Sequence, residues 1–138
     1  MLVVLDATTT HADTMDDAER YVSTREALKV ALEQGHANPR VLRGLLIGTT
    51  STTSYDPVMD YFRRHLTDRQ LLRDLIAIAL EGEDNGDAPW AAANVITEFP
   101  GTLLREIEPE LIQLSKEQWL YLNKPAKEAL QKIKNNRA

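Results

Sequence analysis

Cysteine is absent from this chain of 138 residues. That absence excludes disulfide bonds, thiol catalysis, zinc–thiolate sites and iron–sulfur clusters, because each of them needs the cysteine sulfur. A reducing compartment is compatible with this composition, and we expect a cytoplasmic protein. An excess of basic residues is also absent, since 16 Lys and Arg stand against 21 Asp and Glu, for a net charge of −5. General binding to nucleic acid or to an anionic membrane is therefore disfavoured.

Long hydrophobic runs are missing as well. Asp6 ends the apolar start of the chain, and the run 75–80 is far shorter than the roughly 20 residues needed to span a bilayer. A secretory signal would need a longer apolar stretch, usually behind a positively charged start. We therefore expect no membrane association. We also expect residues 1–14 to form a loosely ordered segment, followed by a single domain over residues 15–138.

Groups of residues that could support catalysis are not found. No two of the three histidines, His11, His36 and His65, have the i, i+4 spacing of a helical zinc site. The hydroxyl-rich run 49–54 lacks a nearby histidine and a Gly-x-Ser-x-Gly elbow. The acidic turn that imitates a calcium loop has Ala92 where the bidentate glutamate belongs. We expect a protein that is not an enzyme, with no catalytic residue, no metal site and no cofactor.

The pattern of apolar residues after the N-terminal segment is helical. Ser23, Thr67 and Ser115 each open a capping-box pattern, and glycines such as Gly35 and Gly82 stand where helices should end. The strand signature is weak, so we predict an all-α fold. The predicted helices are 16–22, 24–34, 39–49, 57–66, 68–81, 88–99, 103–114, 116–122 and 124–135. Pro109 should split or kink the helix that contains it.

The chain repeats its apolar pattern at an offset of 34 residues. Sliding the sequence on itself by this offset aligns four helices, and 14 of 16 aligned core positions are apolar, against 43% of the whole chain. The aligned sets are Thr24, Ala27, Leu28 and Ala31; Val58, Tyr61, Phe62 and His65; Ala92, Val95, Ile96 and Phe99; and Ala126, Ala129, Leu130 and Ile133. The residues expected in the core include Leu72, Leu75, Ile76, Val95, Ile96, Phe99 and Leu130.

Two segments carry a resemblance to a known family of folds. The stretch 90–96, Trp-Ala-Ala-Ala-Asn-Val-Ile, is similar to the second-helix core of a HEAT-type repeat, where small residues let helices approach closely. The stretch 125–133, Pro-Ala-Lys-Glu-Ala-Leu-Gln-Lys-Ile, is similar to the same second-helix core. The chain thus resembles the HEAT/armadillo-like αα-repeat family, over about residues 57–135. The resemblance implies antiparallel helical hairpins stacked as a short superhelix, and an irregular helical bundle is the alternative.

Charge is unevenly distributed along the chain. Residues 81–110 hold eight acids and one base, a balance of −7, whereas residues 111–138 hold six bases and two acids, a balance of +4. One interpretation is a solvated face, and the other is an acidic surface that binds a basic partner. Trp90 and Trp119 flank this region, and packing in the core is the favoured interpretation for each. The predicted partner-binding residues are Glu81, Glu83, Asp84, Asp87, Trp90, Glu106 and Glu110.

These observations predict a protein-binding module without catalytic chemistry. Stacked helical repeats present extended surfaces to partners. An acidic protein of this size would suit an adaptor, or an inhibitor or immunity protein that covers a basic partner such as a toxin nuclease. The alternative is a HEAT-like enzyme of the alkylated-base DNA glycosylase type. A basic cluster of Arg63, Arg64, Arg69 and Arg73 favours that alternative, and the overall acidity opposes it, so nucleic acid is an unlikely partner.

Overall fold

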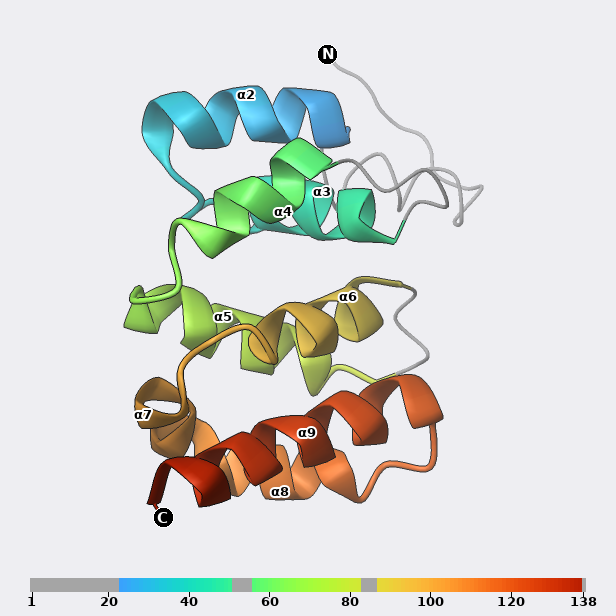
Figure 1. Ribbon diagram of the computed structural model, residues 1–138. Helices are drawn as coiled ribbons and strands as arrows, with labels where there is room; N and C mark the ends of the chain where they lie inside the picture. Colours follow the sequence, from blue (N-terminus) through green and yellow to red (C-terminus); the bar gives the residue numbers. More distant parts are fainter. Residues whose placement is uncertain (1–22, 51–55, 83–86, 138) are drawn as a thin grey trace. The chain divides into compact units, whose positions relative to one another are not determined.

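The computed structural model describes residues 23–50, 56–82 and 87–137, and every regular element within these ranges is helical (Figure 1). The predicted all-α fold is confirmed. The elements are α2 (Thr24–Gln34), α3 (Pro39–Thr49), α4 (Asp56–Arg63), α5 (Arg69–Ala79), α6 (Asp87–Ile96), α7 (Gly101–Leu104), the 3-10 turn η3 (Arg105–Ile107), α8 (Glu108–Ser115) and α9 (Leu120–Arg137). The predicted segment 1–14, the helix 16–22, Glu83 and Asp84 lie outside the described residues.

The chain divides into two compact units, residues 1–45 and residues 46–138. In the first unit, α2 has the predicted bounds because local signals define both of its ends. The Ser23 side chain accepts a hydrogen bond from the Glu26 backbone N–H, and Gly35 ends the helix at a φ of 89° that favours glycine. The Thr24 hydroxyl donates to the Gly44 carbonyl at 2.9 Å and so joins α2 to α3.

The second unit contains two antiparallel helical hairpins. Helix α5 packs on α6, α8 packs on α9, and the two hairpins meet mainly through α6 and α9 (Figure 1). The short helix α7 also packs on α9. Helix α6 is therefore enclosed between neighbours on two sides, and the start of α9 lies beside it. This arrangement places side chains of α6 and α9 at one surface.

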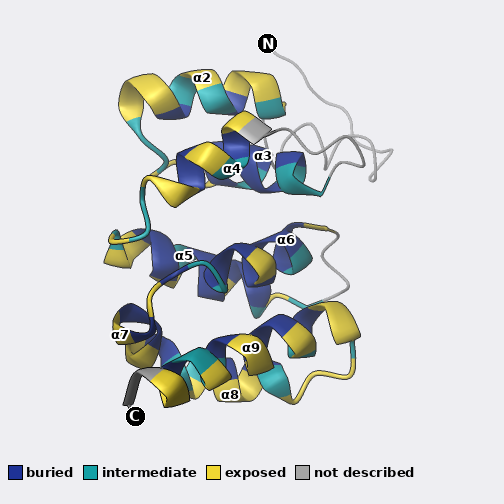
Figure 2. Cartoon of the chain, in the orientation of Figure 1, coloured by how far each residue is buried: buried dark blue, intermediate teal, exposed yellow. Residues whose placement is uncertain are grey.

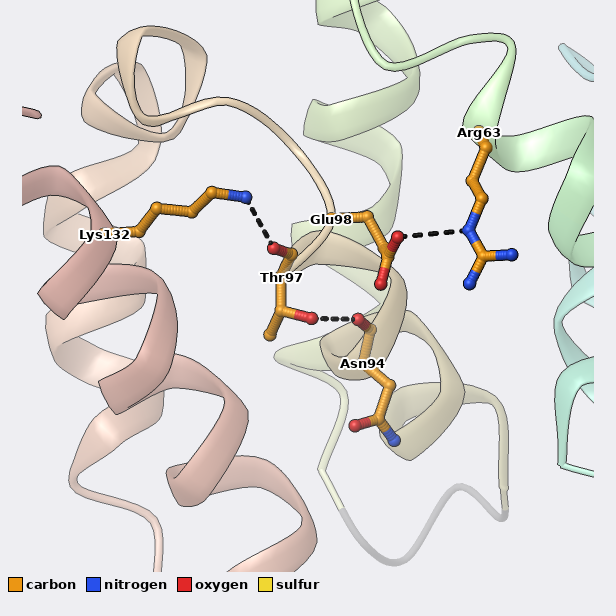
Figure 3. A network of polar contacts seen from close by, with 5 residues as sticks. All are labelled: Arg63, Asn94, Thr97, Glu98 and Lys132. Atoms are coloured by element: carbon orange, nitrogen blue, oxygen red, sulfur yellow. Dashed lines mark hydrogen bonds and ion pairs between the residues drawn. The ribbon is translucent and has the colours of Figure 1, made fainter.

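Two polar contacts in this unit join residues that are 35 positions apart. The Arg63 Nε donates to the Glu98 carboxylate at 3.2 Å, and the Lys132 ammonium donates to the Thr97 carbonyl at 3.0 Å (Figure 3). The first contact links α4 to the end of α6, and the second links that same turn to α9. The 34-residue repeat and the HEAT-like family stay predictions.

The core of the second unit follows the predicted apolar stripes (Figure 2). The predicted residues that are buried are Leu72, Leu75, Ile76, Val95, Ile96 and Phe99. The prediction is wrong for Leu130, which is half-buried. Helix α9 buries Ala126, Ala129 and Ile133. Leu130 lies at the edge of that narrower stripe, so part of its side chain reaches solvent.

The C-terminal third corrects two predicted boundaries. Ser115 is the last residue of α8 rather than a cap for a helix 116–122, and its hydroxyl donates backward to the Ile112 carbonyl at 2.6 Å. Helix α9 begins at Leu120 and continues through Pro125. A proline at this position removes the N–H that would bond the Tyr121 carbonyl.

Pro109 behaves as predicted. The segment predicted as one helix over 103–114 is divided into α7, η3 and α8, and Pro109 is the second residue of α8. Its missing N–H costs little there, because the first turn of a helix leaves its donors without intrahelical partners.

The cap of α5 provides a direct test of local structure. The predicted cap was Thr67, whereas the structure shows the Asp68 carboxylate accepting from the Leu71 N–H at 3.0 Å. We expect Asp68→Ala to lower the free energy of unfolding by about 0.5–2 kcal/mol, because an orphan donor loses its partner. Thermal or urea unfolding measures the loss. Thr67→Ala is the matched control and should cost less, and a larger loss for Thr67→Ala would contradict the observed cap.

Candidate functional site

The predicted acidic residues lie at two ends of the α5–α6 hairpin. Glu81 follows the end of α5 and Asp87 opens α6, and both are exposed. Glu106, in η3, pairs instead with Arg69, which opens α5, at 2.9 Å. Glu110 is half-buried one turn later, in α8. A helix of the length of α5 spans about 16 Å, so these residues do not gather in one patch.

Arginines compensate two of the acids between 81 and 110. Glu98 pairs with Arg63 at 3.2 Å, and Glu106 pairs with Arg69. The arginine side chains are more than half exposed, so each pair contributes only about 0–1 kcal/mol to stability. Their effect on surface charge is larger, because each brings a cation directly beside a carboxylate. Glu81 and Asp87 lie at the other end of the hairpin, and both are exposed.

The two tryptophans are surface residues rather than core residues. Trp90 and Trp119 are both half-buried, which corrects the favoured interpretation of each. Tyr121 lies between them: its ring centroid is 5.0 Å from that of Trp90 and 5.5 Å from that of Trp119. The rings are tilted by 43° in the first pair and perpendicular in the second. Both are arrangements that aromatic quadrupoles favour.

A groove of about 360 Å³ lies at this cluster, between α6 and the start of α9. Its lining is largely apolar and aromatic, with a few polar groups. The lining residues are Trp90, Asn94, Leu120, Tyr121, Lys124, Pro125 and Glu128. Leu120 is 62% exposed and Tyr121 is 52% exposed, which makes them the most exposed large apolar side chains of the second unit among the described residues.

Trp90 is among the binding residues predicted from the sequence, whereas the α9 side of the groove is not. A signal was present in the run 119–122, where four large apolar residues stand in succession. A helix buries only the side chains that face its neighbours, and Leu122 is the buried member of this run. The remaining side chains of this run must therefore reach the surface.

The groove contains one hydrogen-bonded amide, Asn94, and two exposed charged side chains, Lys124 and Glu128. The Asn94 amide donates to the Trp90 carbonyl at 3.2 Å, which fixes it along α6. Lys124 and Glu128 are one helical turn apart on α9, and both are exposed. Within the part of the chain that the structure describes, neither has an ion-pair partner within 4.0 Å. The groove thus offers one cation and one anion beside apolar surface.

The histidine with a described environment in the second unit is engaged in packing. The His65 ring stacks on Tyr61 with centroids 4.3 Å apart, and its Nδ1 lies 2.7 Å from the Tyr61 carbonyl. Burial raises the pKa of the Tyr61 hydroxyl above its usual value, and the nearby Asp68 carboxylate raises it further. Within residues 23–50, 56–82 and 87–137, no group of three or more His, Asp or Glu residues is arranged to hold a metal ion.

Comparisons with known proteins identify no relative of the chain. No protein-family model, no curated protein and no solved structure matches the chain. None of the described helices combines the length and the apolar character needed to cross a membrane. The aromatic groove between α6 and α9, with the acidic end of the α5–α6 hairpin beside it, is the candidate functional site.

Proposed function

We propose that this chain is a protein-binding module without catalytic chemistry, which engages a basic partner as an adaptor or as an inhibitor or immunity protein. One observation carries the proposal: Trp90, Leu120 and Tyr121 form a solvent-accessible cluster around an open groove. Tryptophan and tyrosine are enriched among the residues that dominate binding energy at protein interfaces. An exposed cluster of this kind on a small protein is typical of an interaction surface.

The charge beside the cluster supports a basic partner. Asp87 and Trp90 are three residues apart on α6, so they share one face of that helix. Glu81 lies at the same end of the hairpin. Carboxylates at the rim of an interface attract an oppositely charged partner and accelerate association, and salt weakens that attraction. A toxin nuclease, whose substrate face is basic, has the required charge.

The arginine contacts support a protein partner over nucleic acid. Of the four arginines in the predicted basic cluster, Arg63 and Arg69 each pair with a carboxylate. A groove for nucleic acid needs cations that neutralise phosphates, and a cation already beside a carboxylate does this poorly. These contacts therefore weigh against the glycosylase-type alternative.

The proposal is tested by exchanging charges at the acidic end of the hairpin. After a partner has been purified with the wild-type chain, its affinity is measured for the double variant Glu81→Lys and Asp87→Lys. We expect binding to weaken at least about tenfold, or about 1.4 kcal/mol, with a smaller loss at high salt. The thermal midpoint should stay nearly unchanged, because exposed charges contribute little to stability.

A matched control separates a local effect from one of net charge. Glu33→Lys with Asp60→Lys makes the same total charge change at exposed positions of α2 and α4. Equal weakening by both double variants would contradict a specific acidic surface, and so would unchanged affinity in both. A captured toxin domain that loses activity on binding would assign the inhibitor role, whereas retained activity would assign the adaptor role.

A further inference from the structure

We infer that the groove between α6 and α9 is covered by a second copy of this chain, related to the first by a two-fold axis. A two-fold interface brings the same surface of both copies together, so that surface must be complementary to itself. The groove and its rim have this property, because acidic, aromatic and basic side chains follow one another along them. The inference goes beyond the proposed function and does not depend on it.

The order of these side chains follows from the direction of the two helices. Helices α6 and α9 begin at the same end of the second unit and pack on each other (Figure 1). Asp87, the first residue of α6, is exposed and lies about one turn before Trp90, whose ring contacts that of Tyr121 near the start of α9. Lys127 and Lys134 are exposed further along α9, the first of them about 9 Å beyond Tyr121. The surface therefore changes from acidic to basic along the direction of both helices.

The middle of this surface carries two opposite charges on α9. Lys124 and Glu128 are about one turn apart, and both are exposed and line the groove. Within the part of the chain that the structure describes, neither has a charged partner within 4.0 Å. When two copies of α9 lie antiparallel across a two-fold axis between these residues, Lys124 of each copy faces Glu128 of the other. Two opposite pairs form at once, and they fix the register of the two copies.

The same antiparallel arrangement matches the two ends of the surface. The acidic start of α6 in one copy lies towards the later, basic part of α9 in the other, so Asp87 approaches Lys127 or Lys134 across the interface. Leu120 and Tyr121, which are both more than half exposed in a single copy, become covered near the axis. A second copy thus complements both ends of the surface, whereas a partner of one charge sign complements one end.

The net charge of −5 on each copy does not prevent this contact. At about 0.15 M salt the Debye length is about 8 Å, so repulsion between charges spread over two copies is largely screened. Opposite charges in direct contact at a partly desolvated interface are screened much less. Because exposed ion pairs contribute little binding energy, burial of the aromatic cluster provides most of the affinity and the charges provide the register.

Self-association has a consequence for partner binding. Asp87 and Trp90 belong both to the two-fold surface and to the proposed partner-binding surface, so a second copy and a basic partner exclude each other. The chain therefore keeps its partner-binding surface covered at high concentration, until a partner displaces the second copy.

The test is charge exchange at the two-fold axis, followed by analytical ultracentrifugation of the full chain at about 0.15 M salt. We expect a reversible monomer–dimer equilibrium for the wild type at chain concentrations up to about 1 mM. Lys124→Glu sets glutamates against glutamates across the axis, and Glu128→Lys sets lysines against lysines, so each variant alone should weaken the dimer at least about tenfold. An equimolar mixture of the two variants should restore a dimer, because every like-charge contact then becomes an opposite pair.

Matched variants separate the interface from the effect of net charge. Arg73→Glu and Asp60→Lys make the same charge changes at exposed positions of α5 and α4. Each should dimerise as the wild type does, and mixing the two should add nothing. Tyr121→Ala should weaken the dimer at least about tenfold, because it removes an aromatic ring from the centre of the interface. Circular dichroism checks that every variant is folded.

Two outcomes overturn the inference: a wild-type chain that stays monomeric up to about 1 mM, and a dimer that Lys124→Glu and Glu128→Lys both leave unchanged. If the chain stays monomeric while a basic partner is captured through Glu81 and Asp87, the inference fails and the proposed function stands. If the chain dimerises through α9 while charge exchange at Glu81 and Asp87 leaves partner capture unchanged, the proposed function fails and the inference stands.

Discussion

Replacing Leu75 by alanine is expected to lower the free energy of unfolding of the second unit by about 2–5 kcal/mol. Leu75 is fully buried in α5, where it packs among residues of the α5–α6 hairpin. The substitution removes apolar surface from the core and leaves a cavity, because the surrounding helices relax only partly. Ile96→Ala should fall in the same range, since Ile96 is only 1% exposed at the end of α6. Urea unfolding followed by circular dichroism measures both losses.

Leu120→Ala is the matched control for Leu75→Ala. The chemical change is identical, but Leu120 is 62% exposed at the start of α9. We expect its effect on stability to stay within about 0.5 kcal/mol. A loss below about 0.5 kcal/mol for Leu75→Ala and Ile96→Ala would contradict the core described above. The comparison thus distinguishes Leu75, which stabilises the core, from Leu120, which lies at the proposed binding surface.

Local signals in the sequence predicted the fold class and several helix boundaries. The bounds of α2 followed from the Ser23 cap and Gly35, and those of α3 began at Pro39, as expected. Such signals act through neighbours in sequence, so they can be interpreted without knowledge of the tertiary fold. Pro125 shows the limit of the approach. The predicted helix 124–135 has Pro125 as its second residue, but the Trp119 carbonyl accepts bonds from the Leu122 and Asn123 N–H groups at 3.0 Å each, and α9 begins earlier, at Leu120.

The candidate site was only partly predictable, because it is built from two hairpins. The sequence predicts Trp90 as a binding residue but does not indicate Tyr121 or Leu120, because their place beside Trp90 depends on how α6 and α9 pack. The acidic set illustrates the same limit. Glu81 and Glu106 both belong to the acidic stretch 81–110, yet Glu81 follows the end of α5 while Glu106 pairs with Arg69 at its start. Position along a sequence does not determine which end of a hairpin a residue reaches.

Helix α6 buries three successive alanines between its neighbours. Ala91, Ala92 and Ala93 are successive and all at most 1% exposed. Successive residues of a helix point about 100° apart, so three buried neighbours require packing on more than one side. Helix α6 has this environment because it lies against both α5 and α9. Small side chains at these positions allow the helices to approach closely.

Ala92→Leu is therefore expected to destabilise the second unit by about 1–3 kcal/mol through overpacking. Ala92 is fully buried, so the larger side chain must displace α5 or α9 or adopt a strained rotamer. Ala77→Leu, the same substitution at an exposed position of α5, should change stability by less than about 0.5 kcal/mol. Thermal unfolding of both variants measures the difference. Equal stability of the two would show that α6 has room that the described packing does not contain.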